Sequence, residues 1–228
     1  MKTLIFNGSP RPDGDTVSLI RILTGDADRT KKSPICADTG NETVDLSHES
    51  GQVGRACEKP SEELKCMQRP TVLIGEYLLV NAYRADISAC VDCRWCWSHE
   101  GCKINDGMQG IYEYMKECDN ILIASPIHFS ELTGKLLALL SRLQSVYCAR
   151  AFQNTELIAK PKRGAILLVG GGDGRPDRAC TTARILLHTM NCAEIMEPVI
   201  SHQTNERPAA EDEEAVQGVR KIAEFFNR

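Results

Sequence analysis

Apolar residues in this chain gather into short runs that are separated by polar and turn-forming segments. Two of the runs, Asn120–Ser125 and Gly164–Val169, are continuously apolar, as is typical of strands buried on both faces of a parallel sheet. Lys2–Phe6 is a shorter run that ends at a turn-rich segment. Thr71–Tyr83 is rich in β-forming residues, and Ile195–Ile200 predicts a last strand. The pattern therefore predicts a sheet of mostly parallel strands.

Helical spacing of apolar residues follows several of these runs. After the first strand, for example, Val17, Ile20 and Leu23 recur with the period of a helix. The pattern predicts helices over Thr16–Leu23, Ile111–Cys118, Leu132–Tyr147, Thr181–Met190 and Asp212–Asn227. Alternating strands and helices are typical of an α/β fold in which helices cover both faces of a parallel sheet. We expect one domain over 1–228, with no internal repeat.

The segment Thr24–Pro70 interrupts this alternation. It is polar, charged and poor in large apolar residues. We interpret it as a polar surface insertion at about 24–70 rather than as a lid or an oligomer contact, because such a composition favours solvent-exposed loops.

Composition and charge limit the classes of function. Apolar residues make up 42% and charged residues 25% of the chain, as in ordinary globular proteins. The net charge of −4 does not indicate a surface for nucleic acid or an anionic membrane. We find no apolar run of the roughly 20 residues that span a bilayer, and the start lacks the features of a signal peptide. We expect a cytoplasmic protein whose cysteines are reduced, buried, catalytic or metal-bound.

The loop after the first strand reads NGSPRPDGDT. It places Ser9, Arg11, Asp15 and Thr16 beside the first amides of a helix, and hydroxyls, a guanidinium and free amides all suit a phosphate. The alternative is a simple turn in which Asp15 or Thr16 caps the helix.

Two further loops follow buried strands. The segment SPIHF contains His128 and Phe129, and GGGDG begins at Gly170. A glycine run lets the backbone approach a flat ligand closely, although it is also common in flexible turns. In a parallel sheet, these loops and the first one leave the same edge, where ligands bind.

Four cysteines lie within the stretch CVDCRWCWSHEGC: Cys90, Cys93, Cys96 and Cys102. The spacing CxxCxxC supplies three thiolates from one tight loop, and the fourth completes the ligand set of a 4Fe-4S cluster. Structural zinc sites usually join two CxxC pairs across a longer stretch, so zinc fits less well. A third alternative is that the thiols hold no metal. Trp95 and Trp97 flank Cys96 and could shield a metal centre, stack on a ligand or simply pack.

Taken together, these segments resemble the flavodoxin-like NAD(P)H-dependent FMN reductase family. The shared features are NGSPR…T, ASPIHF…LTGKL, VGGG and SHQTNERPAAED. The cysteine stretch followed by INDGM is similar, more narrowly, to the iron–sulfur flavoprotein branch. The resemblance covers most of the chain outside Thr24–Pro70. It implies a flavodoxin-like three-layer sandwich with a five-stranded parallel sheet.

The resemblance also implies site residues. The FMN phosphate would be surrounded by Ser9, Arg11, Asp15, Thr16, Val17 and Ser18. The ribityl chain and flavin ring would be bordered by Pro126, Ile127, His128 and Phe129, and the other edge of the ring by Gly171, Gly172 and Asp173. Three positions depart from the family, and at one of them Leu137 replaces a common Lys. Asp15 stands where Asn is usual, which is unfavourable beside a phosphate unless the carboxylate turns away to cap the helix, and Ser141 replaces the Asp of a common Asp-Arg pair.

We therefore expect an FMN-dependent oxidoreductase that takes electrons from NAD(P)H or a small redox protein. It would pass them to a small-molecule acceptor or a redox protein, and a 4Fe-4S cluster could take part. A cluster-free NAD(P)H:FMN or quinone reductase and a non-enzymatic flavodoxin-like electron carrier are the alternatives. The flavin does the chemistry in such proteins, so we name no catalytic residue. The resemblance suggests a homodimer or homotetramer with the flavin and cluster near a subunit interface. From the charge and the apolar pattern, we expect no nucleic acid or membrane partner.

Overall fold

The computed structural model describes residues 1–25 and 71–228, so the proposed insertion at about 24–70 lies almost wholly outside the described residues. The strands are β1 (Thr3–Asn7), β2 (Thr71–Ile74), β3 (Tyr77–Asn81), β4 (Asn120–Pro126), β5 (Lys162–Val169), β6 (Cys192–Ile195) and β7 (Val199–Ser201). The helices are α1 (Asp15–Thr24), α3 (Met108–Glu117), α4 (Gly134–Leu140), α5 (Gln144–Gln153), α6 (Asp177–Thr189) and α7 (Glu213–Phe226). Short 3-10 turns are η2 (Trp95–Trp97), η3 (Ser141–Leu143) and η4 (Ala209–Glu211).

The strands form one sheet in the order β2-β3-β1-β4-β5-β6, and β7 also pairs with β5. Every pairing is parallel except that of β2 with β3. The predicted fold class is confirmed. The predicted number of five strands is wrong, because the sheet has seven strands within the described residues alone.

Two local features explain the extra strands. The β-rich run Thr71–Tyr83 folds back on itself at Gly75, whose φ of 58° is a conformation that glycine adopts without strain. The predicted last strand is broken at Pro198, which has no N–H for a strand ladder. The two pieces, β6 and β7, pair with opposite ends of β5.

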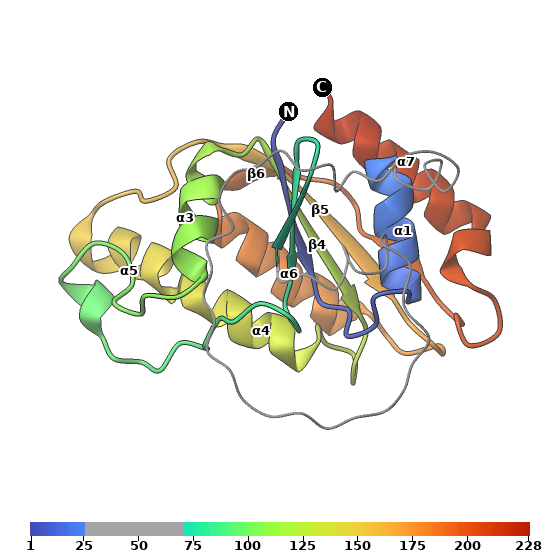
Figure 1. Cartoon of the computed structure of the whole chain (residues 1–228), viewed down its shortest axis with the longest axis horizontal. Coiled ribbons are helices and arrows are strands. Elements are labelled where there is room, and N and C mark those ends of the chain that lie inside the picture. The colour runs from blue at the N-terminus through green and yellow to red at the C-terminus, as the bar shows by residue number, and fades with distance from the viewer. Residues whose placement is uncertain (26–70) are drawn as a thin grey trace, which may run out of the picture.

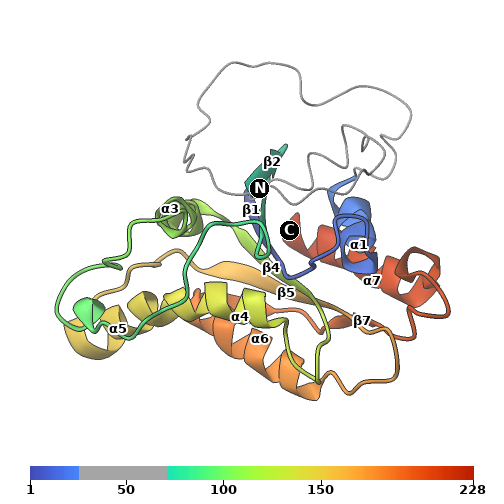
Figure 2. The same cartoon turned by 60° about the horizontal axis from the view of Figure 1, so that its bottom comes forward.

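Helices cover both faces of the sheet, as Figures 1 and 2 show. On one face, α1 and α7 pack over Ile5, Leu122 and Leu167. On the other face, α3, α4, α5 and α6 pack over Phe6 and Ile123. Consecutive residues of each strand thus contribute to opposite cores, which is why the buried strands are continuously apolar.

The predicted long helix Leu132–Tyr147 is two helices. The turn η3 separates α4 from α5, and at its start the Ser141 hydroxyl donates to the carbonyl of Ala138 at 2.6 Å. Such a side-chain bond to the preceding turn competes with the helical pattern and bends helices. The break lets Ser141 and Arg142 contact the loop that follows β3.

Parallel pairing brings the carboxyl ends of β1, β3, β4, β5 and β7 to one edge of the sheet. The strand order reverses at β1, which lies between β3 and β4. Ligands bind at such a reversal in open α/β sheets. Within residues 1–25 and 71–228, no helix combines the length and apolar character needed to cross a bilayer.

Candidate functional site

A pocket lies at this reversal point, where the loops after β1, β4, β5 and β7 meet. We call it the edge pocket. Its lining residues are Ser9, Arg11, Asp15, Thr16, Pro126, Ile127, His128, Val169, Gly171, Thr204 and Asn205. Polar groups from the β1 loop and apolar groups from β4 and β5 thus share one hollow.

The start of α1 points polar groups at this pocket. Gly14 is the N-cap of the helix, and no side chain caps it. Ser9 and Thr16 lie nearby with only 2% of their surface exposed. The turn is fixed by Asn7, whose side chain accepts a hydrogen bond from the Ser9 amide at 2.9 Å. A helix start without a capping side chain, together with hydroxyls and the Arg11 guanidinium, can bind a phosphate.

The Asp15 carboxylate turns towards another part of the chain. Its Oδ1 accepts a hydrogen bond from the Ala209 amide at 2.9 Å, at the start of η4. Its Oδ2 lies 3.9 Å from a guanidinium nitrogen of Arg11. The side chain therefore turns to a helix start, but to that of η4 rather than that of α1. It ties the β1 loop to the C-terminal part of the chain.

The loop after β4 is a tight turn under strain. His128 and Glu131 exchange backbone hydrogen bonds of 2.9 and 3.0 Å. Between them, Phe129 and Ser130 both have positive φ, 52° and 65°, which is unusual for residues other than glycine. Phe129 is exposed. Strain of this kind is concentrated at ligand-binding sites.

The Thr133 side chain connects this loop to the β1 loop, and its amide connects the loop to β4. The Thr133 hydroxyl donates to the Gly8 carbonyl at 2.9 Å, and the Thr133 amide donates to Ser125 Oγ at 3.1 Å. A Cβ on Gly8 would lie 2.8–2.9 Å from Thr133, Leu136 and Ser125. Only glycine therefore fits where the β1 loop passes under α4.

The loop after β5 packs against the segment that follows β7. Thr204 and Asn205 donate backbone hydrogen bonds to Gly170 and Gly171 at 3.1 and 3.2 Å. A Cβ on Gly171 would lie 2.8 Å from the Asn205 side chain. The β5 loop and Asn205 thus form one wall of the edge pocket.

Asp212 holds the other end of this segment. It caps α7 by accepting from the Ala215 amide, and it also accepts from the Ser201 hydroxyl at 2.8 Å. Burial would raise the pKa of Asp212, but these hydrogen bonds outweigh that effect and lower the pKa. The carboxylate stays ionised and fixes the turn that presents Thr204 and Asn205.

The structure gathers most of the predicted flavin-site residues but not all. Those that line the edge pocket are Ser9, Arg11, Asp15, Thr16, Pro126, Ile127, His128 and Gly171. Val17 is instead buried in the core, and Ser18 donates to the Asp15 carbonyl. Phe129, Gly172 and Asp173 are exposed beside the pocket.

Sequence reasoning missed Val169, Thr204 and Asn205. The stretch SHQTNERPAAED contributed to the family resemblance, and it contains the last two. Its position directly after a strand was the signal that could have assigned them.

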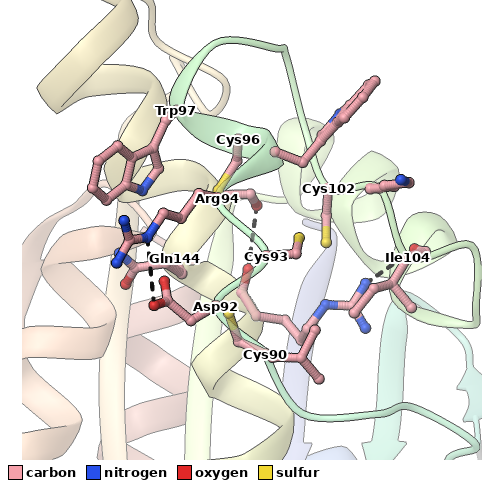
Figure 3. Close-up of a pocket in the computed structure, with 14 residues that line it drawn as sticks. Cys90, Asp92, Cys93, Arg94, Cys96, Trp97, Cys102, Ile104 and Gln144 are labelled. Carbon is pink, nitrogen blue, oxygen red and sulfur yellow. Dashed lines mark hydrogen bonds and ion pairs between the residues drawn. The ribbon is translucent and has the colours of Figure 1, made fainter.

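A second pocket contains the cysteine cluster, and we call it the cysteine pocket. All four thiols surround it, as Figure 3 shows. Besides Cys90, Cys93, Cys96 and Cys102, its lining includes Trp95, Trp97, Ile104, Arg142 and Gln144. The predicted ligands are therefore gathered around one hollow.

Side chains, rather than regular secondary structure, hold the cysteine loop in place. The Cys90 amide donates to Ser141 Oγ at 2.9 Å, and Gln153 donates to the carbonyls of Cys96 and His99 at 2.7 and 2.9 Å. Trp95 stacks on His99 with ring centroids 3.6 Å apart. The loop is thus fastened to η3 and α5.

The four thiols line one pocket, but the structure does not bring them together as a metal site. Within the described residues, no three His, Cys, Asp or Glu side chains are placed to hold a metal ion. Burial and a hydrogen bond with Cys148 raise the pKa of Cys96 to about 12, so metal binding there must displace a proton.

Arg142 is a buried cation beside these cysteines. Burial lowers its pKa, but the hydrogen bond with Asp106 and the negative charge of a Cys102 thiolate raise it above its usual value. Burial raises the pKa of Asp106, but the hydrogen bond from Arg142 and two backbone hydrogen bonds together outweigh this effect. The pKa of Asp106 is therefore lowered overall. Asp106 is therefore the carboxylate partner of Arg142.

The two pockets have no lining residue in common. Figures 1 and 2 both show η2 beside the end of α5 and away from the loop between β1 and α1. The cysteine pocket is therefore separate from the edge pocket within one chain. The loop leaves the predicted edge, but its anchors on Ser141 and Gln153 carry its tip along the helical layer.

Comparisons with known proteins agree with these features. The family model described as NADPH-dependent FMN reductase matches residues 74–206. An iron-sulfur flavoprotein of Methanosarcina thermophila is 37% identical over 86 residues, which cover 38% of this chain and 42% of that protein. An iron-sulfur flavoprotein of Methanocaldococcus jannaschii is 25% identical over 142 residues, covering 62% of this chain and 51% of that protein. The chain thus spans about half or less of the length of these curated relatives.

Solved structures show the same fold. An NAD(P)H:quinone oxidoreductase from Methanothermobacter marburgensis matches with a TM-score of 0.60 at 11% identity, covering 100% of this chain and 96% of that chain. At this identity, the likeness concerns the fold alone.

Proposed function

Because the chain belongs to the NADPH-dependent FMN reductase family, we propose that it is an FMN-dependent oxidoreductase of the iron–sulfur flavoprotein branch. In this proposal, 1–228 is one FMN-binding domain, NAD(P)H reduces the bound flavin, and a small molecule or redox protein accepts the electrons. Bound FMN would supply the hydride chemistry, and the protein supplies binding, orientation and exclusion of water.

The uncapped start of α1 is the observation that carries this proposal. A phosphate there would accept hydrogen bonds from the helix-start amides, the Ser9 and Thr16 hydroxyls and Arg11. The Asp15 carboxylate would repel an anion, but it accepts a hydrogen bond from the Ala209 amide. The donor set therefore fits the phosphate end of FMN.

The remaining walls fit a flat ring. Ile127 and His128 would border one side of it, and Gly171 with Asn205 the other. Gly171 lets the Asn205 side chain pack directly against the backbone, because a Cβ there would lie 2.8 Å from Asn205. The exposed and strained Phe129 would stand at the mouth.

The cysteine pocket supports a 4Fe-4S cluster as a second redox group. The four thiols around one hollow match the ligand number of such a cluster. When bound, a cluster would convert two-electron flavin chemistry into single-electron transfer. A cluster-free reductase is the second candidate, because no group of three or more ligand side chains within the described residues is placed to hold a metal ion.

Because the two pockets are separate in one chain, we further propose a homo-oligomer in which the flavin and the cysteines approach a subunit interface. Trp97 and Phe152 form a partly exposed aromatic pair beside the cysteine pocket, with centroids 4.8 Å apart, and could pack against another protomer.

FMN and riboflavin, which lacks the phosphate, test the edge pocket directly. Apoprotein should bind FMN at least about tenfold more tightly than riboflavin, because several charged and neutral hydrogen bonds reach the phosphate. Arg11→Ala should reduce this preference. Arg21→Ala, on the last turn of the same helix, is the matched control and should leave it unchanged. Equal affinities of the wild-type protein for the two flavins would refute the phosphate site.

The metal is tested separately by iron and acid-labile sulfide analysis of protein purified anaerobically after iron-replete expression. About four irons per chain are expected. Protein that binds FMN but contains no iron would favour the cluster-free reductase.

A further inference from the structure

Arg142 is one of the most deeply buried side chains of the described structure, with 1% of its surface exposed. Its Nη1 donates to Asp106 at 2.6 Å and to the Ser88 carbonyl at 3.1 Å. Its Nη2 donates to the Ile104 carbonyl at 3.1 Å. These contacts account for its position between η3 and the segment 88–106.

These contacts leave one hydrogen-bond donor of the Arg142 guanidinium unpaired. The Nε–H of Arg142 is buried and has no hydrogen-bond partner among residues 1–25 and 71–228. A buried donor without an acceptor is unfavourable, so proteins rarely retain one without a reason. Arg142 also lines the cysteine pocket together with all four thiols. An acceptor in that pocket would satisfy the group.

The charge of Arg142 also favours a negatively charged acceptor in the cysteine pocket. The ion pair with Asp106 already balances the charge of Arg142. Four thiolates around a cluster add net negative charge to the cysteine pocket, and one-electron reduction adds one more. A guanidinium cannot lose its proton, so its charge is present in every redox state.

We propose that Arg142 is a positioning residue for the iron–sulfur group of the cysteine pocket, donating its Nε–H to a sulfur and using its charge to favour the reduced state. The inference rests on the proposed cluster. In the balanced step, one electron enters the cluster, no bond breaks, and Arg142 keeps its proton. The electron comes from the flavin that NAD(P)H has reduced.

A merely structural role makes a different prediction. If Arg142 and Asp106 only fasten the loop, then loss of either partner should loosen it and change the cluster in the same way. If charge matters, the two substitutions act in opposite directions, because one removes a positive charge and the other a negative charge.

The experiment compares the midpoint potential of the cluster in anaerobically reconstituted full-length variants, measured by redox titration followed by electron paramagnetic resonance. Arg142→Gln should shift the equilibrium at least about tenfold towards the oxidised cluster. For a one-electron couple, this lowers the midpoint potential by about 59 mV. Asp106→Asn should shift it towards the reduced cluster. Arg142→Lys, which keeps the charge but not the Nε–H, should fall between Arg142→Gln and the wild type.

Arg150→Gln is the matched control. Arg150 lies on α5, pairs with Glu156 at 2.6 Å and does not line the cysteine pocket, so the potential should stay unchanged. If Arg142→Gln does not fold, the opposite signs of Arg142→Lys and Asp106→Asn still decide. Shifts of the same sign, or an unchanged potential in the Arg142 variants, would overturn the inference while leaving the proposed function intact. Wild-type protein that holds no iron would overturn the proposed cluster and this inference together.

Discussion

Gly8 offers the sharpest test of how the edge pocket is built, because it lies where the β1 loop passes under α4. In Gly8→Ala, the new Cβ would lie 2.8 Å from Thr133 Oγ1 and 2.9 Å from both Leu136 Cδ2 and Ser125 Oγ. All three distances are shorter than real Cβ contacts allow. The two loops must therefore separate.

The cost follows from what the separation breaks. Overpacking of a tight site costs about 1–3 kcal/mol. The two Thr133 hydrogen bonds, to Gly8 and to Ser125, contribute about 0.5–1.5 kcal/mol each. The smaller entropy of the unfolded alanine chain returns about 0.4–1 kcal/mol. We expect a net loss of about 3 kcal/mol.

Urea unfolding followed by circular dichroism measures this loss. The transition midpoint should fall while the slope stays constant, because the surface exposed on unfolding is the same. Gly174→Ala is the control, since a Cβ there meets nothing within 4 Å, and it should change stability by less than about 0.5 kcal/mol. If Gly8→Ala were as stable as Gly174→Ala, the described contact between the β1 loop and α4 would be wrong.

Three further predictions concern single side chains. Asp15→Asn should tighten FMN binding by about 1 kcal/mol in fluorescence titrations, because the amide can still accept from Ala209 while the repelling charge is gone; unchanged or weaker binding contradicts this. Gly171→Ala should weaken FMN binding roughly tenfold, since its Cβ would displace Asn205, and equal affinity would rule out that wall of the pocket. The pKa of Asp106 is lowered in the fold, so its contribution to stability is present above its unfolded pKa of about 3.9 and is lost as the pH falls through the folded value. Urea unfolding between about pH 3 and pH 7 should therefore show a shallower acid loss for Asp106→Asn than for wild type, and parallel curves would argue against the ion pair with Arg142.

The strands were largely predictable because burial on both faces leaves an unmistakable apolar run. Asn120–Ser125 and Gly164–Val169 correspond closely to β4 and β5. The apolar pattern did not reveal the turns that interrupt such runs. Gly75 and Pro198 each divide a run in two, and each is a residue whose backbone preference should outweigh the apolar pattern around it.

The edge pocket was predictable for a topological reason. Loops after parallel strands start at one edge, so Ser9, His128 and Gly171 are brought together although they are far apart in sequence. Thr204 was missed because β7, the strand that positions it, is only three residues long.

The position of the cysteine loop could not be predicted from the strand order. The edge at which a loop begins does not determine where the tip of a long loop lies. That position is set here by Ser141, Gln153 and Arg142, which are single side chains on η3 and α5. The residue pairing of Arg142 with Asp106 has no periodic signal in the sequence, and only the three-dimensional structure reveals it.

Reduction of the bound flavin by nicotinamide tests the central claim most directly. FMN-loaded wild-type protein is mixed anaerobically with NADPH, and separately with NADH, in a stopped-flow instrument that records the visible flavin absorption. An oxidoreductase should lose this absorption with at least one of the two donors, at about 1–1,000 per second as in typical enzymes. Flavin that stays oxidised with both donors would contradict the account and indicate a non-enzymatic electron carrier.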